Sequence, residues 1–86
     1  MKVQNLTSNN GNTVPNQFDI EHNGDRFFQS YDSIIVKISN GQVYLDERYW
    51  NYSNTTSKYR NQFLNETTKQ TQNKIDNGEY NLTNLN

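Results

Sequence analysis

Ser33 to Glu47 reads SIIVKISNGQVYLDE, two apolar, β-branched runs on either side of an Asn-Gly pair. Asn40-Gly41 is the strongest short-range signal for a two-residue hairpin, because a type I′ turn needs a positive φ at both central positions. Such a turn fixes the register, so that Val36 faces Leu45. One side of this hairpin, which we expect to face the core, then carries Ile34, Val36, Ile38, Val43 and Leu45. The opposite side carries Ile35, Lys37, Tyr44 and Asp46.

A second hairpin is predicted for residues 16–31, NQFDIEHNGDRFFQSY, around Asn23-Gly24. We expect Glu21 to form a cross-strand ion pair with Arg26. One side of this hairpin, expected to join the core, carries Phe18, Ile20, Phe27 and Tyr31. The other side, expected to face outward, carries Asp19, Glu21, Arg26 and Phe28.

A first helix is predicted from Asn54 to Leu64. Ser53 is a favoured N-cap residue, and Tyr59 and Phe63 are four residues apart, so that both lie on one face. The apolar face of this short helix is expected to pack on the sheet.

A second helix is predicted from Thr67 to Asn77. Thr67 and Gln70 have the spacing of a capping box, and Gly78 suits the position after the last turn. The fold class predicted is therefore α+β: a four-stranded antiparallel β-meander with two short C-terminal helices packed on one face. The polar ends of the chain, near Val3 and near Leu82, could each add an edge strand. The predicted core is Phe18, Ile20, Phe27, Ile34, Val36, Ile38, Val43, Leu45, Tyr59, Phe63 and Leu64.

The composition is that of one small domain, residues 1–86. A chain of this length buries only about 60% of the surface that its unfolded form exposes, which leaves room for a single core. The net charge is −1, and neither half is basic enough to mark a nucleic-acid footprint. The chain has no cysteine, no apolar leader and no run as long as a membrane span. We therefore expect a cytoplasmic protein without membrane contact.

Catalytic groups are scarce in this sequence. The only histidine, His22, stands next to a predicted turn, and Asp46 and Glu47 are neighbours that would point to opposite faces of a strand. No phosphate-binding loop, nucleophile motif or metal-ligand spacing occurs. We expect no enzyme activity, no cofactor and no metal.

Two motifs carry a resemblance to a known family. FQSY at residues 28–31 and YSNTTSKY at residues 52–59 are its most specific parts. With the segments around them, they resemble a family of small, uncharacterised phage-borne proteins, over about Val3 to Asn86. The resemblance implies an origin in a phage or prophage of an AT-rich bacterium. A protein of this origin is expected to act in the host cytoplasm. It implies no activity and no catalytic residue.

The second motif allows two interpretations. Ser53, Thr55 and Thr56 could simply cap a helix start, and capping alone accounts for every residue. The same hydroxyl groups with Lys58 could instead hold an anion at free N–H groups of the helix.

The function expected is binding without catalysis. A small phage accessory protein without catalytic groups would bind a host or phage protein, for example as an anti-CRISPR-like inhibitor of a host defence system, an analogy by class alone. The candidate partner-binding residues are Phe28, Ile35, Tyr44, Trp50, Tyr52, Lys58 and Arg60. The alternative is a nucleic-acid-binding accessory protein that uses Trp50, Tyr52, Lys58 and Arg60. A homodimer through an exposed edge strand is a further option.

Overall fold

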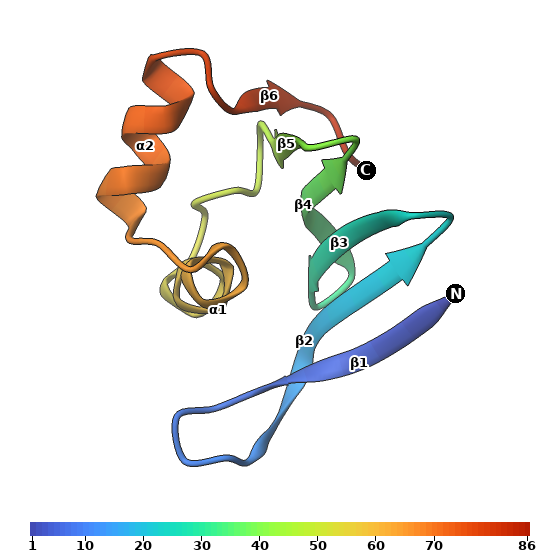
Figure 1. Ribbon diagram of the computed structural model, residues 1–86. Helices are drawn as coiled ribbons and strands as arrows, with labels where there is room; N and C mark the ends of the chain where they lie inside the picture. Colours follow the sequence, from blue (N-terminus) through green and yellow to red (C-terminus); the bar gives the residue numbers. More distant parts are fainter.

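The computed structural model describes every residue from Met1 to Asn86 and shows a small α+β fold, with one mixed sheet and two helices (Figure 1). The sheet has six strands in the order β1-β2-β3-β4-β5-β6. All neighbouring strands are antiparallel except β5 and β6, which are parallel. The strands are β1 (Lys2–Thr7), β2 (Thr13–His22), β3 (Asp25–Ser30), β4 (Ser33–Ser39), β5 (Gln42–Asp46) and β6 (Asn81–Thr83).

Both predicted hairpin turns are confirmed. Asn23 and Gly24 have φ of 55° and 84°, and Asn40 and Gly41 have φ of 52° and 77°, as a type I′ turn requires. The registers follow as expected, with Ile20 opposite Phe27 in the hairpin of β2 and β3. The prediction of an ion pair between Glu21 and Arg26 is wrong. Arg26 forms its ion pair with Asp19 instead, at 2.9 Å.

The sheet is larger than the four-stranded meander predicted. Both polar ends of the chain add a strand: β1 pairs with β2, and β6 pairs with β5. A parallel neighbour needs a long crossover connection, and the two helices between β5 and β6 provide it (Figure 1).

The helices begin and end close to the predicted residues. Helix α1 (Asn54–Leu64) is capped by Ser53, whose Oγ accepts the N–H of Thr56 at 3.1 Å. Helix α2 (Thr68–Asp76) starts with the predicted capping box of Thr67 and Gln70. Neither helix is long and apolar enough to cross a membrane.

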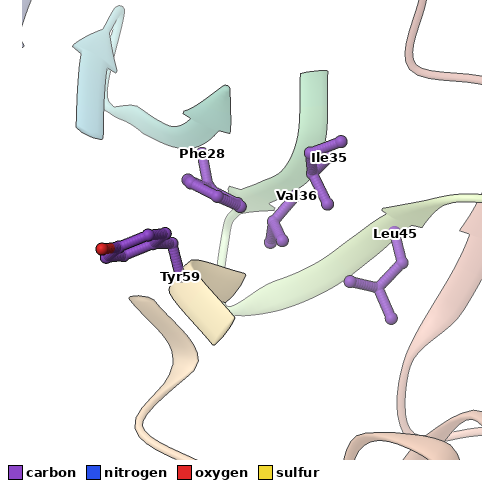
Figure 2. Packing of buried hydrophobic residues seen from close by; sticks show 5 residues of the cluster. All are labelled: Phe28, Ile35, Val36, Leu45 and Tyr59. Atoms are coloured by element: carbon purple, nitrogen blue, oxygen red, sulfur yellow. The ribbon is translucent and has the colours of Figure 1, made fainter. Parts of the chain in front are cut away.

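The core lies between the sheet and the helices, and it contains Phe28, contrary to the prediction. Phe28 is fully buried and stacks on Phe63 of α1 with ring centroids 5.7 Å apart. The register places Phe28 opposite Val36, and Val36 opposite Leu45, so all three face the helices. Figure 2 shows the cluster of buried hydrophobic residues, which consists of Phe28, Ile35, Val36, Leu45 and Tyr59.

A β-bulge explains why Ile35 is also buried. The pairing of β3 with β4 shifts between Phe28 and Gln29, so that Ile35 is an extra residue on β4. A bulge breaks the alternation of side chains along a strand, and here Ile35 and Val36 are both fully buried. Ile35 was predicted to lie outside, and the bulge is the physical reason for the error.

Candidate binding surface

A row of paired residues crosses the whole sheet on the side away from the helices. Phe27 precedes Phe28 on β3, and successive side chains of a strand point to opposite faces, so Phe27 faces away from the core. Residues directly opposite each other in neighbouring strands share a face. The row that contains Phe27 consists of Val3, Ile20, Phe27, Lys37, Tyr44 and Asn81.

A second row lies beside the first. It pairs Asn5 with Phe18, Phe18 with Gln29 and Gln29 with Ile34. Together, the apolar residues of the two rows and Lys37 form a surface that we call the open face: Val3, Phe18, Ile20, Phe27, Ile34, Lys37 and Tyr44. Four of these residues were predicted to lie in the core or on its side of the hairpins, namely Phe18, Ile20, Phe27 and Ile34.

The side chains of the open face are only partly shielded. Val3 is 52% exposed, and the others are half-buried by their neighbours in the sheet. The ammonium group of Lys37 lies 6.0 Å from the centroid of the Phe27 ring, within the range of a cation–π contact. The open face thus presents aromatic and aliphatic groups with one cation in the middle.

Three of the seven predicted partner-binding residues do not reach the surface. Phe28 and Ile35 belong to the core, and Arg60 is fully buried. Their burial leaves no side-chain surface for a partner to contact. Tyr44 does lie on the open face, as the hairpin register predicted.

The other three predicted residues lie around the start of α1. Tyr52 is 48% exposed and packs edge-on against Tyr49, whereas Trp50 is half-buried against the core. Lys58 is exposed, with its ammonium group 5.4 Å from the centroid of the Tyr59 ring. The aromatic–basic cluster expected from the sequence is therefore divided between the interior and the surface.

Arg60 is a buried cation without a carboxylate partner. Its guanidinium group lies 5.0 Å from the centroid of the Trp50 ring and donates to the Trp50 carbonyl oxygen. It also donates to Asn61 Oδ1 and Thr68 Oγ1, each at 2.9 Å, and its Nε has no partner. Burial lowers the pKa of Arg60, and the nearby charge of Glu66 opposes that shift. The contacts join α1 to the Trp50 loop and to α2, a structural role.

Comparison with known proteins assigns the chain to a family. A family model described as a family of unknown function (DUF8033) matches residues 1–79. The chain belongs to this family. No curated protein and no solved structure matches it. The assignment agrees with the resemblance to an uncharacterised family, and the family description supplies no activity.

The DUF8033 chain contains one ionisable cluster that the sequence analysis missed. Glu66, whose side chain is 5% exposed, accepts hydrogen bonds from Lys74 Nζ at 2.8 Å, from the Tyr80 hydroxyl at 2.7 Å and from Thr71. Burial favours a higher pKa for Glu66, but these hydrogen bonds outweigh it and lower the pKa. The hydrogen bond to Glu66 raises the pKa of Lys74. Only the distances in the fold reveal the cluster, because Glu66 precedes α2 and Tyr80 follows it, so that no repeat within a single helix or strand predicts their contact.

A second buried carboxylate, Asp46, holds the C-terminal tail. Asp46 is 1% exposed and accepts the backbone N–H groups of Arg48, Tyr49 and Leu85 and the side-chain amide of Asn86. Burial would raise the pKa of Asp46, yet the four donors together lower it. These donors join the end of β5 to the residues that follow it and to the C-terminal tail, so the contacts of Asp46 are structural.

The hydroxyl groups at the start of α1 act within the fold. Ser53 caps the helix, and Thr56 is buried with its Oγ1 2.8 Å from the Ser30 hydroxyl oxygen. These contacts support the capping interpretation of the YSNTTSKY motif.

The hollows on this DUF8033 fold are shallow and polar. The largest has a volume of about 620 Å³ beside the Asn23-Gly24 turn and includes His22, Glu21 and Asp25 among its walls. Small-molecule sites are usually lined by apolar side chains, and no hollow here has more than two hydrophobic residues. No three His, Cys, Asp or Glu side chains are grouped as they would be to hold a metal ion. The open face is therefore the strongest candidate for a functional site.

Proposed function

We propose that this DUF8033 protein acts without catalysis by binding another protein through the open face. The observation that supports the proposal is the row of Ile20, Phe27, Lys37 and Tyr44, which crosses the middle of the sheet on the side away from the helices and stays partly exposed. Aromatic residues dominate the energetic centres of protein interfaces, and apolar surface without a cover marks interaction sites. Binding would bury these side chains as the helices bury the other face.

A protein suits the open face better than a nucleic acid does. Lys37 is the one cation among its side chains, and the net charge of the chain is −1. Binding to a phosphate backbone depends on several Lys and Arg contacts. Aromatic residues on an open sheet do stack with single-stranded bases in some folds. The experiment must therefore be able to detect nucleic-acid binding, which would contradict the proposal.

The proposed setting follows from the resemblance to phage-borne proteins. In that setting, the partner is a host protein in the bacterial cytoplasm, such as a component of a defence system, and the chain inhibits it by covering a surface. The support for this part is the small size of the chain and the analogy with phage accessory proteins.

Variants of the open face test the proposal in capture experiments from host lysate with and without nuclease. Tyr44→Ser and Lys37→Glu change the open face. Tyr52→Ser changes an exposed tyrosine away from that face, in the alternative aromatic–basic cluster, and serves as the matched control. The partner should then be purified and titrated against each folded variant. We expect Tyr44→Ser to weaken its affinity about 30-fold, as loss of an interface anchor worth about 2 kcal/mol would.

Two results would contradict the proposal. One is equal affinity of the partner for wild type and for the two open-face variants. The other is retention of nucleic acid alone, with every captured protein lost after nuclease treatment.

A further inference from the structure

The free edge of β1 carries backbone groups that have no partner strand. β1 is the first strand in the sheet order, and five of its six residues are exposed. The other edge strand, β6, has only three residues. Short edge strands are a common protection against pairing between molecules, and β1, with six residues, lacks that protection.

The hairpin register shows which groups of β1 point outward. Residues on either side of a two-residue turn form a hydrogen-bonded pair, and such pairs alternate along an antiparallel ladder. His22 and Asp25 flank the Asn23-Gly24 turn, so Ile20 directs its N–H and C=O groups towards β3. Val3 lies opposite Ile20 on the other side of β2. Val3 therefore directs its own N–H and C=O groups towards the free edge.

The same alternation applies two residues further on. Asn5 lies opposite Phe18, which also bonds towards β3, so Asn5 directs both backbone groups outward. Gln4 lies between them and bonds towards β2. The free edge thus offers one donor and one acceptor at Val3 and the same pair at Asn5.

We propose that two copies of this chain associate by antiparallel pairing of their β1 strands around a two-fold axis at Gln4. In this register, Val3 of each copy faces Asn5 of the second copy. All four free groups of each edge then have a partner, which makes the edge complementary to itself. This interaction uses the edge of the sheet and does not depend on the proposed binding by the open face.

The charges of β1 favour a second copy as the partner. Its only charged residue, Lys2, faces Glu21 on β2 within the same copy and would face Leu6 of the second copy. Like charges directly opposite each other would be unfavourable, and this register places none in such a position. Val3 and Asn5, which share the open side of the strand, are uncharged. The pairing also joins the two open faces into one continuous surface.

The absence of cysteine makes the register directly testable. The two Gln4 residues would form a non-hydrogen-bonded pair, with Cβ atoms about 4.5–5 Å apart, close to the separation in a disulfide. The matched control is Lys2→Cys on the same side of the same exposed strand. Its two Cβ atoms would be more than about 12 Å apart in this register, four residues along the strand. We expect Gln4→Cys to form covalent dimers about tenfold faster than Lys2→Cys under mild oxidation.

A second variant tests the edge without a cross-link. Val3→Pro removes an N–H group that points outward and bonds to nothing within the monomer, and proline is tolerated in edge strands. Circular dichroism should show an unchanged fold. Sedimentation equilibrium should show a wild-type dimer that dissociates on dilution, as a small interface would, and a Val3→Pro protein that stays monomeric.

Three outcomes would overturn the proposal. The wild-type chain could stay monomeric at millimolar concentration. Gln4→Cys could cross-link no faster than Lys2→Cys. Val3→Pro could dimerise as strongly as wild type, which would place the contact on another surface.

Discussion

At the scale of single residues, Asp46 connects parts of the chain that are distant in sequence. Its carboxylate accepts the Tyr49 N–H at 2.9 Å and the Leu85 N–H at 2.8 Å, and so ties the end of β5 to the C-terminal tail. Hydrogen bonds to a charged group contribute more than those between neutral groups, and a buried donor left without its acceptor is costly. We therefore expect the Asp46 carboxylate to stabilise the fold more than a neutral side chain of the same size would.

We predict that Asp46→Asn lowers the free energy of unfolding at pH 7 by about 2 kcal/mol. An asparagine keeps the size of the side chain but loses the charge and one acceptor atom. Urea denaturation of both proteins measures the difference. The matched control is Asp32→Asn, at an exposed turn residue, which should leave the stability unchanged within about 0.5 kcal/mol.

The same carboxylate gives the stability a pH dependence with a defined sign. The folded-state pKa of Asp46 lies below its unfolded-state value. Its contribution is therefore full above the unfolded-state pKa and is lost as the pH falls through the folded-state pKa. Glu66, whose pKa is also lowered, acts in the same direction. Wild type should lose more stability than Asp46→Asn between neutral and acidic pH, and parallel curves would contradict this assignment.

At the scale of elements, the two faces of β3 should differ sharply in their tolerance of change. Phe28 is fully buried against Phe63, whereas the neighbouring Phe27 is half-buried on the open face. We predict that Phe28→Ala costs about 3–5 kcal/mol, the range for a buried phenylalanine, and that Phe27→Ala costs about 1 kcal/mol. Chemical denaturation of the two variants measures both values. Equal losses would mean that the open face is covered.

The sequence predicts the turns and caps of this fold but not which face of the hairpin of β2 and β3 is buried. Asn-Gly pairs and capping residues act within a few positions, so their structures follow from local chemistry. Phe27 and Phe28 are adjacent, and each side of the hairpin therefore holds an aromatic residue. The period of two cannot choose between these sides, and the bulge at Ile35 disturbs the pattern of the next strand.

The candidate site could be predicted only where the pattern along one hairpin decides the position of a residue. Tyr44 could be placed on an outer face because its hairpin has a clear apolar side. Arg60 looked like a surface cation, as most arginines are. Its burial depends on Trp50, Asn61 and Thr68, whose positions only the packed helices determine.

At the scale of the whole molecule, the sheet is completed by its C-terminal end. β6 joins β5 as the only parallel strand, after a connection that contains both helices. Beyond β6, Asn86 reaches β4: its Oδ1 accepts the Ile34 N–H at 2.8 Å, and its Nδ2 donates to the Ile34 carbonyl oxygen at 2.9 Å. One side chain thus continues the hydrogen bonding of the sheet past the end of the strand.

We predict that Asn86→Ala lowers the free energy of unfolding by about 1 kcal/mol, because it removes these two bonds and a third to Asp46. The local effect should be larger than the global one. In hydrogen-exchange measurements, the Ile34 amide should lose protection, whereas the amides in the middle of β3 and β4 should change only with the global stability. Asn9→Ala, in an exposed turn, is the control that should alter neither quantity. Unchanged protection of the Ile34 amide in Asn86→Ala would show that the tail does not hold β4 in solution.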